Sequence, residues 1–231
     1  MRAVSIGAHL WFVAVVFRFA APLYPIADAD SCAEVLALID AILAAGAPLL
    51  QVRAKSHATR DLVELARAAQ ARCARAGARL IINDRADVAK LAGSDGVHLG
   101  QDDLPAAAAR EILGPAAIIG VSTHNAEQLD AAVRDGVADY LAYGPIFATA
   151  SKANPDPTQG LASLAAVRAR SARPLVAIGG ITAATLPDVL AAGADAVAVI
   201  AAIARASDPE AATRTLLHAA RRAAAARTVR A

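Results

Sequence analysis

Short apolar runs alternate with longer segments of mixed polarity along the chain from residue 23 onward. The runs are rich in Val, Ile and Leu, and eight of them are expected to form strands: 23–28, 48–53, 79–84, 96–100, 117–122, 139–144, 174–180 and 196–203. Strands that are this uniformly apolar are typical of a parallel sheet covered on both faces. The pattern therefore predicts a sheet buried between layers of helices.

The segments between the runs are rich in alanine and have the spacing of helices. In 61–76 the apolar residues recur every three or four positions, which predicts an amphipathic helix. Ser31 followed by Glu34 has the form of a capping box at the start of a helix. Gly77 follows the 61–76 segment and suits the left-handed residue that ends a helix.

Eight strand-then-helix units predict an α/β fold, a closed TIM (β/α)8 barrel built as a single domain. The length of 231 residues agrees with this, since such a domain takes about 250 residues. An open doubly wound sheet is the alternative, but the first strand lacks the G-x-G-x-x-G turn of dinucleotide-binding folds. We place the barrel domain at 22–231 and an N-terminal extension at 1–21.

The extension carries Arg2, an apolar run from Leu10 to Phe17 and then Arg18, which loosely imitates a secretory signal. The run is shorter than the roughly 20 apolar residues that span a bilayer. Three interpretations stay open: a weak signal peptide, an amphipathic extension, or a start codon placed too far upstream. We favour the last two over export, because the rest of the chain is typical of intracellular small-molecule chemistry.

The charge balance argues against a polyanionic partner. Formal net charge is +2, with 23 basic and 21 acidic residues interspersed, so no broad field would gather nucleic acid or an anionic membrane. Cys32 and Cys73 lie in helical segments outside any CxxC pair, and we expect reduced packing residues in a cytoplasmic protein. Small-molecule substrates are the expected partners; the oligomeric state stays open, with a homo-oligomer as one alternative.

Polar side chains gather where the predicted strands end, and in a barrel of this kind the loops that follow the strands form one catalytic face. The stretch "IINDRADVA" (81–89) places Asn83 and Asp84 directly behind an apolar pair, and the next strand leads to Asp103. Two carboxylates from neighbouring strands suit Mg²⁺ shared with the phosphates of a substrate. Taken alone, Asp84 has a simpler interpretation as a helix N-cap.

Cations on the same face suit an anionic substrate. Arg53 and Lys55 follow the second strand, and Lys152 lies in the long connection 144–159. A guanidinium fork and two ammonium groups would neutralise a highly charged phosphate. A second anion site is expected where Gly180 lets backbone N–H groups approach a phosphate. One substrate is thus predicted to carry a pyrophosphate and the other a monophosphate.

Two histidines lie near the same strand ends. His98 alternates into a strand and His124 precedes a helix, but neither has metal-ligand spacing. We interpret both as structural residues or as polar groups that support the site. Ser122 has no nearby acid–base partner of a hydrolase triad and is not assigned as a nucleophile.

Several motifs occur in order along the chain: "QVRAK", "INDRADVA", "DGVHLGQDDLP", "IIGVSTHN", "DYLAYGPIFATASK", "AIGGI" and "GADAVAVIAAI". From about Leu23 to the final helix, this series resembles the thiamine-phosphate synthase family. The resemblance implies a TIM-barrel transferase that joins hydroxymethylpyrimidine pyrophosphate to a thiazole phosphate. It also implies that pyrophosphate is released and that Mg²⁺ is the cofactor.

The resemblance implies a role for individual residues. Asp84 and Asp103 are similar to the magnesium ligands of the family. The substrate-binding residues implied are Gln51, Arg53, Lys55, Asn83, Ser122, Thr149, Ser151, Lys152, Gly180, Ile200 and Ala201. Of these, Gln51, Arg53 and Lys55 are expected on the pyrimidine pyrophosphate and Asn83 on the pyrimidine. The catalytic residues implied are Arg53, Lys55, Ser122 and Lys152.

The chain departs from the family pattern in the loop "ATASK", which usually reads P-T-x-T-K. Ala148 replaces the proline, and Ser151 replaces a threonine but keeps the hydroxyl donor. Pro25 removes a ladder donor from the first strand. Two alternatives stay open: a thiazole tautomerase-like isomerase on the same barrel, and a non-catalytic paralogue that binds a phosphate ligand. The combined acidic and basic cluster favours the synthase.

Overall fold

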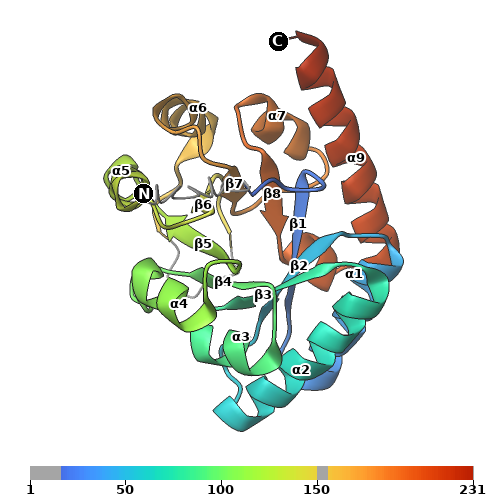
Figure 1. The fold of residues 1–231 in the computed structure, drawn as a ribbon. Coiled ribbons are helices and arrows are strands. Elements are labelled where there is room, and N and C mark those ends of the chain that lie inside the picture. Colours follow the sequence, from blue (N-terminus) through green and yellow to red (C-terminus); the bar gives the residue numbers. More distant parts are fainter. Residues whose placement is uncertain (1–16, 150–155, 231) are drawn as a thin grey trace, which may run out of the picture.

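The computed structural model describes residues 17–149 and 156–230. Eight parallel strands close into a barrel in which each strand pairs with its neighbours in the sequence, and β8 pairs with β1 (Figure 1). The strands are β1 (Leu23–Asp28), β2 (Leu49–Arg53), β3 (Arg79–Asn83), β4 (Gly96–Leu99), β5 (Ile118–Thr123), β6 (Tyr140–Tyr143), β7 (Leu175–Ile178) and β8 (Ala196–Val199). The predicted TIM barrel is confirmed.

Helices surround the barrel and connect successive strands (Figure 1). They are α1 (Cys32–Ala44), α2 (Thr59–Ala76), α3 (Ala86–Ala92), α4 (Ala106–Leu113), α5 (Ala126–Asp135), α6 (Gly160–Arg170), α7 (Leu186–Ala191), α8 (Ala201–Ala204) and α9 (Pro209–Arg230). The final helix, α9, lies against both α7 and α1. It therefore closes the ring of helices by joining the last part of the barrel to the first.

The predicted helix ends agree with the structure. Ser31 and Glu34 form the expected capping box at the start of α1, each side chain bonding the backbone of the other. Gly77 ends α2 with φ +66, the left-handed conformation that glycine adopts without strain. The eighth strand was predicted too long: β8 ends at Val199, and the alanine-rich residues from 201 form the short helix α8.

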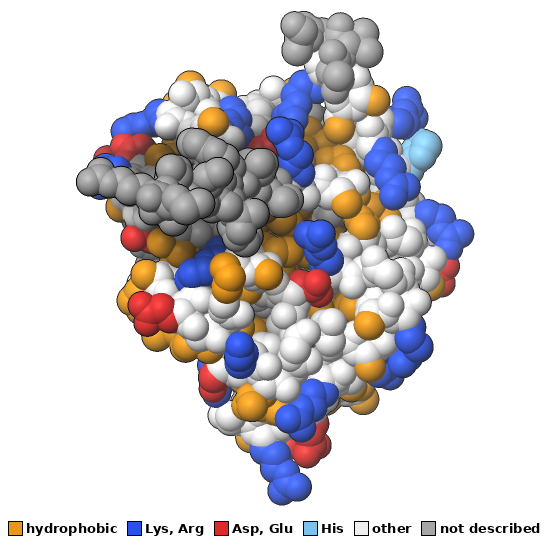
Figure 2. Space-filling model, in the orientation of Figure 1, with side chains coloured by type: hydrophobic (Ala, Val, Ile, Leu, Met, Phe, Trp, Pro, Cys, Tyr) orange, Lys and Arg blue, Asp and Glu red, His pale blue; other side chains and the backbone are white. Residues whose placement is uncertain are grey.

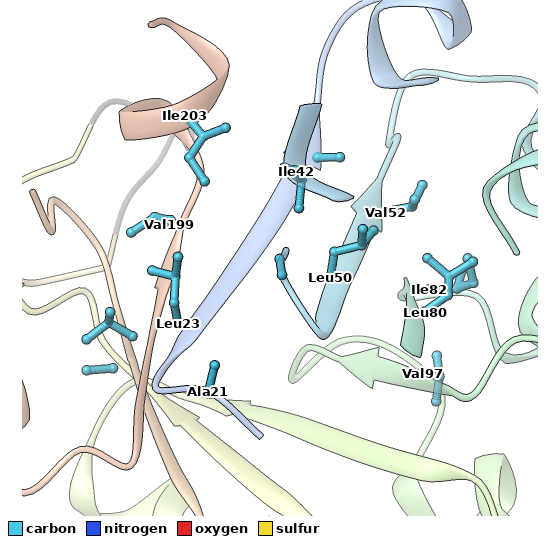
Figure 3. Packing of buried hydrophobic residues seen from close by; sticks show 14 of the residues in the cluster. Ala21, Leu23, Ile42, Leu50, Val52, Leu80, Ile82, Val97, Val199 and Ile203 are labelled. Atoms are coloured by element: carbon cyan, nitrogen blue, oxygen red, sulfur yellow. The ribbon is translucent and has the colours of Figure 1, made fainter. Parts of the chain in front are cut away.

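Strand side chains alternate between two buried layers. Inward positions such as Ile26, Leu49 and Ile81 form one cluster inside the barrel. Outward positions such as Leu50 and Ile82 form a second cluster with the helices. Figure 3 shows part of this outer layer, where strand residues meet side chains from the surrounding helices. Because both faces are covered, the strands lack polar alternation, which explains their uniformly apolar sequence.

The last residues of the predicted extension belong to the inner layer. Phe17 is 8% exposed and its ring lies 5.6 Å from that of Tyr140, measured between centroids. The Phe19 ring lies 5.9 Å from Tyr24 and 5.3 Å from Tyr140. These contacts place aromatic side chains beneath the barrel, at the end where the strands begin. The division at residue 21 stays a prediction, and residues 1–16 lie outside the described part of the chain.

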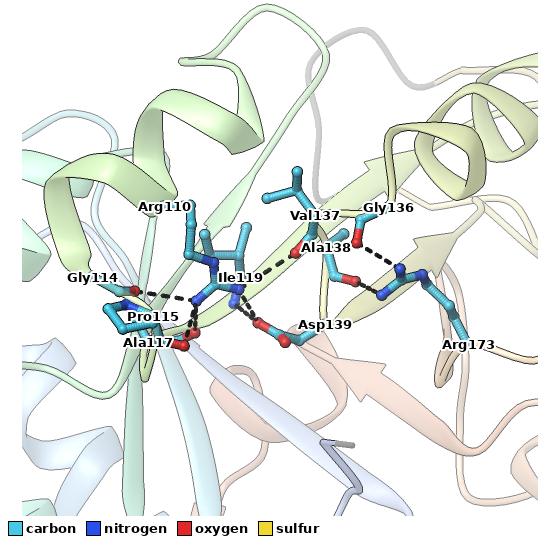
Figure 4. Close-up of polar contacts among 10 residues, drawn as sticks. All are labelled: Arg110, Gly114, Pro115, Ala117, Ile119, Gly136, Val137, Ala138, Asp139 and Arg173. Atoms are coloured by element: carbon cyan, nitrogen blue, oxygen red, sulfur yellow. Dashed lines mark hydrogen bonds and ion pairs between the residues drawn. The ribbon is translucent and has the colours of Figure 1, made fainter. Parts of the chain in front are cut away.

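Aspartates stabilise the end of the barrel where the strands begin. Asp95, Asp139 and Asp195 each precede a strand, and each accepts a hydrogen bond from a backbone N–H of the preceding strand, at 2.8, 2.8 and 2.9 Å. Arg110 of α4 also binds Asp139, at 2.7 Å, together with backbone carbonyl groups of the adjoining loops (Figure 4). Polar groups at this end of such a barrel contribute to stability rather than to catalysis.

Two further sequence expectations concern the surface and the cysteines. Lys and Arg side chains are dispersed over the face shown in Figure 2, with Asp and Glu among them. Cys32 and Cys73 are free thiols, and Cys73 is fully buried, as expected of packing residues. Within the described residues, every helix is too short or too polar to cross a membrane.

Candidate active site

A pocket of about 560 Å³ opens at the end of the barrel where the strands finish. All the expected site residues within the described part of the chain line this pocket: Gln51, Arg53, Lys55, Asn83, Asp84, Asp103, Ser122, Thr149, Gly180, Ile200 and Ala201. Ser151 and Lys152 lie outside the described residues. The side chains that the sequence places at separate strand ends are therefore neighbours in space.

The two-residue period of the strands explains this convergence. Every second residue of a strand points into the barrel. In β2, the first of these residues, Leu49, packs in the inner apolar layer, whereas Gln51 and Arg53, nearer the end of the strand, line the pocket. In β3, Ile81 packs in the same layer and Asn83 lines the pocket. In β2 and β3, an apolar-to-polar change along the inward face thus separates the core from the site.

A carboxylate at the end of β1 holds Arg53 in place. Asp28 pairs with Arg53 in the register of β1 and β2, and its Oδ2 forms an ion pair with Arg53 Nη1. Both side chains are about four-fifths buried, at 18% and 21% exposure, so the guanidinium is confined. Asp28 was not among the expected site residues, although applying the strand-end rule to the first strand would have found it.

Asp84 joins the cationic and acidic groups of the pocket. Its Oδ2 lies 3.0 Å from Lys55 Nζ. Asp84 has φ +64, an uncommon conformation for a residue with a side chain, and its backbone N–H donates to the His98 carbonyl at 2.7 Å. The simpler interpretation as an N-cap is wrong, because Arg85 occupies that position in α3 and no side chain caps the helix.

Asp103 lies against Asp84, so two carboxylates face each other. Asp103 Oδ2 accepts a hydrogen bond of 2.6 Å from the Gly100 N–H. Partial burial raises the pKa of Asp103, and the adjacent Asp84 carboxylate raises it further, partly offset by the Gly100 N–H and by Lys55. Two like charges in contact are costly, and Asp84 and Asp103 would bind a divalent cation favourably because its charge would offset their repulsion.

The donor chemistry of this pair fits Mg²⁺. Magnesium in proteins is commonly held by one or two carboxylates together with substrate phosphates and water. In the described ranges 17–149 and 156–230, no cluster of three or more His, Cys, Asp or Glu side chains could hold a metal ion. Asp84 and Asp103 therefore suit a shared ion that also contacts substrate, rather than a closed site made by protein alone.

The Asn83 side chain carries an unused donor. Its Nδ2 is buried and has no hydrogen-bond partner among the described residues. A buried amide without a partner costs free energy, commonly about 1–3 kcal/mol, unless a ligand satisfies it. Asn83 lines the pocket, so a substrate acceptor could complete this bond.

Hydrogen bonds support Ser122 from below. His98 Nε2 lies 2.8 Å from Ser122 Oγ, and His98 Nδ1 lies 2.9 Å from the Tyr140 hydroxyl. The interpretation of His98 as a supporting polar group agrees with these contacts. Tyr140 and Tyr24 were missed, because an apolar strand context makes a tyrosine look like a packing residue.

His124 also lines the pocket. Its Nδ1 lies 2.9 Å from the Gly144 carbonyl oxygen and 3.5 Å from Asp156 Oδ2. These contacts connect the end of β5 to the two described parts of the long connection after β6. The expectation of a structural or supporting role agrees with them.

A larger hollow of about 940 Å³ lies at the opposite end of the barrel, beside residues 17–22 and the end of α6. Arg168 and Arg227 there bind Asp195, at 2.8 and 3.6 Å. None of the expected site residues lines this hollow, and these cations are paired with protein carboxylates. The smaller pocket is the candidate active site.

Comparison with known proteins agrees with this geometry. Residues 23–203 match the family described as thiamine monophosphate synthase. The chain belongs to this family. A thiamine-phosphate synthase of Laribacter hongkongensis is 45% identical over 197 residues, covering 84% of this chain and 92% of the relative. A thiamine-phosphate synthase of Koribacter versatilis is 49% identical over 185 residues, covering 78% of this chain and 87% of the relative.

A solved structure supports the same assignment. Thiamine phosphate pyrophosphorylase from Pyrococcus furiosus superposes with a TM-score of 0.78 at 32% identity, covering 88% of this chain and 96% of that chain. Sequence similarity and fold similarity therefore agree on the family of this chain.

Proposed function

We propose that this family member is a thiamine-phosphate synthase. It condenses 4-amino-2-methyl-5-hydroxymethylpyrimidine pyrophosphate with a thiazole phosphate to give thiamine monophosphate and pyrophosphate. The observation that carries the proposal is the convergence of Arg53, Lys55, Asp84 and Asp103 in one pocket. Cations and paired carboxylates together suit a metal-chelated diphosphate, and the curated relatives named above carry this activity in their names.

The cationic side of the pocket binds the pyrophosphate in this proposal. Arg53 offers a planar fork that Asp28 orients, and Lys55 adds a point charge beside Asp84. Lys152, Thr149 and Ser151 are assigned to the pyrophosphate or the thiazole phosphate on the family resemblance. Charge that develops on the departing pyrophosphate is stabilised by these preorganised groups.

Asp84 and Asp103 hold Mg²⁺ in the proposal. When bound, the ion neutralises negative charge on the pyrophosphate and makes it a better leaving group. The support is the carboxylate pair itself, because its mutual repulsion favours a site that gains a cation.

The remaining contacts position the two organic groups. Asn83 offers its unused amide N–H to the pyrimidine, and Gln51 lies beside it in the pocket. Gly180, Ile200 and Ala201 are assigned to the thiazole phosphate through their backbone. At Gly180 (φ +63) an added Cβ would lie 2.4 Å from the Ala148 carbonyl oxygen, so only glycine allows this close approach.

The reaction is a substitution at the methylene carbon of the pyrimidine. The carbon–oxygen bond to pyrophosphate breaks first, and the aminopyrimidine delocalises the positive charge that develops. The thiazole nitrogen then donates its electron pair to form the new carbon–nitrogen bond, so no general base is needed. The protein contributes by positioning both reactants and by keeping water from intercepting the cation.

Pyrophosphate release with each substrate omitted in turn tests the proposal. A synthase needs both substrates and Mg²⁺. A tautomerase-like isomerase would convert the thiazole phosphate alone and release no pyrophosphate. A non-catalytic binder would give a calorimetric binding signal without turnover under every condition.

A cytoplasmic location completes the proposal. Both cysteines are free, and burial raises the pKa of Cys73 to about 12, so this thiol stays protonated and unreactive. A disulfide between Cys32 and Cys73 in the native protein would contradict this location.

A further inference from the structure

A continuous chain of hydrogen bonds crosses the interior of the barrel beneath the pocket. Gln51 Nε2 donates to the Tyr24 hydroxyl at 2.9 Å, and the Tyr24 and Tyr140 hydroxyls are 2.9 Å apart. Tyr140 in turn contacts His98 Nδ1 at 2.9 Å, and His98 Nε2 contacts Ser122 Oγ at 2.8 Å. The chain starts at one pocket residue, Gln51, and ends at another, Ser122.

The number of hydrogens on each group limits the directions that the chain can take. A phenol has one hydrogen to donate. Tyr24 accepts from Gln51, and when its own hydrogen is directed to Tyr140, the hydrogen of Tyr140 is available for His98 Nδ1. A neutral imidazole that accepts at Nδ1 carries its proton on Nε2, and it therefore donates to Ser122 Oγ. The Ser122 hydroxyl hydrogen is then directed away from His98.

We propose that Tyr24 and Tyr140 are positioning residues that hold His98 as the Nε2–H tautomer and thereby make Ser122 a hydrogen-bond donor to the substrate pyrophosphate. Pyrophosphate oxygens only accept hydrogen bonds, so a serine that donates stabilises them and one that can only accept does not. The kinetic part of this inference rests on the proposed function, whereas the tautomer of His98 does not.

Two structural features keep the chain intact. Burial raises the pKa of both phenols, so each keeps its hydrogen at neutral pH. Phe17 and Phe19 pack against the tyrosine rings from below and so limit the access of water. Each inner hydroxyl thus bonds to a protein neighbour rather than to water.

Space for the Tyr140 ring depends on the neighbouring strand. A Cβ at Gly120 would lie 2.1 Å from Tyr140 Cζ, closer than any packed structure allows. The absence of a side chain at Gly120 therefore lets the phenol reach His98. This close approach explains why a glycine is needed at position 120, in the motif "IIGVS".

Nitrogen-15 NMR of histidine in Tyr140→Phe tests the tautomer directly. In the wild-type protein, we expect His98 to show the Nε2–H form. In Tyr140→Phe, Nδ1 loses its donor, and we expect a mixture of the two tautomers. A wild-type His98 protonated on Nδ1 would overturn the proposal, because His98 would then donate to Tyr140 and accept from Ser122.

Tyr143→Phe is the matched control. Tyr143 lies on the same strand, but its hydroxyl bonds Gln159 at 3.0 Å on the helix side of the barrel. This variant also removes one buried phenol hydroxyl, and we expect the His98 spectrum to stay unchanged. An equal change of the spectrum in both variants would contradict a specific role for Tyr140. Tyr24→Phe, which breaks the chain one bond earlier, provides a second test if Tyr140→Phe folds poorly.

Kinetics then separate positioning from simple loss of stability. Tyr140→Phe should lower kcat about tenfold, comparable to one weakened transition-state hydrogen bond, with little change in KM. In a Ser122→Ala background the same substitution should have no further effect, since Tyr140 acts through the missing hydroxyl. Equal losses in both backgrounds would overturn the proposal. Absence of pyrophosphate release from the wild type would refute the proposed function instead, and the His98 tautomer could still be measured.

Discussion

Replacing Asp103 by Asn should stabilise the metal-free protein while it destroys activity. The substitution keeps an oxygen that can accept the 2.6 Å bond from the Gly100 N–H. It removes the charge that opposes Asp84, and the new amide can donate to the Asp84 carboxylate. In a metal site, a charge such as that of Asp103 can support catalysis although it lowers the stability of the metal-free protein.

The size of the effect can be estimated from the interaction between the two carboxyl groups. Two unit charges about 4 Å apart repel by about 1 kcal/mol in water and about 4 kcal/mol at the effective dielectric constant of a protein surface. Lys55 Nζ, 3.0 Å from Asp84 Oδ2, cancels part of this repulsion, and the site is open to solvent. We therefore expect Asp103→Asn to raise the free energy of unfolding by about 1 kcal/mol, or Tm by about 2–4 °C.

The pH dependence of stability gives a second signal from the same variant. Because the fold raises the pKa of Asp103, the native protein binds a proton that the unfolded chain has already lost. The metal-free wild type should therefore lose stability as pH rises from the ordinary range of an aspartate through the raised pKa. Asp103→Asn should lack this loss.

Thermal unfolding in EDTA, with and without added Mg²⁺, measures both effects. We expect Mg²⁺ to stabilise the wild type more than the variant, and we expect at least about a hundredfold loss of turnover in the variant. Asp40→Asn is the control, because Asp40 forms an exposed pair with Arg72 at 2.9 Å on the helices. A lower Tm for Asp103→Asn, with full activity, would refute the reasoning.

The remaining predictions concern catalytic residues, the end of the barrel where the strands begin, and the packing of Tyr140 inside the barrel. Asp84→Ala and Lys152→Ala should each reduce turnover at least about a hundredfold, and near-wild-type rates in both purified variants would remove them from the site. Arg110→Ala should lower the free energy of unfolding by about 2 kcal/mol in urea titrations without changing KM; an unchanged midpoint would contradict its stabilising role. Gly120→Ala should cost about 1–3 kcal/mol through the clash with Tyr140, and a protein as stable as the wild type would contradict that contact.

The barrel could be predicted because its periodic features are local in the sequence. Eight apolar runs each supplied a strand, and the capping residues Ser31 and Glu34 marked a helix start. The predicted end of the eighth strand was wrong. The residues "VIAAI" continue the apolar run, but the strand ends at Val199 and the backbone then forms α8. Apolar character alone does not distinguish a buried strand from a buried helix.

The candidate site was predictable to the extent that strand ends share one face. That rule found Asp84 and Asp103, whose carboxylates meet in the pocket. It could not find the Tyr24–Tyr140 contact, which joins residues 116 positions apart across the interior of the barrel. The left-handed backbone of Asp84 also depends on a tertiary contact, the hydrogen bond from its N–H to the His98 carbonyl oxygen.

The central claim is that opposite charges from separate strands converge so that a metal-chelated diphosphate can depart. Measuring pyrophosphate and thiamine monophosphate together, with both substrates and either Mg²⁺ or EDTA, tests it most directly. The account predicts one pyrophosphate for each thiamine monophosphate with Mg²⁺, and neither product in EDTA. Equal rates in EDTA, or pyrophosphate released at the same rate without the thiazole phosphate, would contradict it.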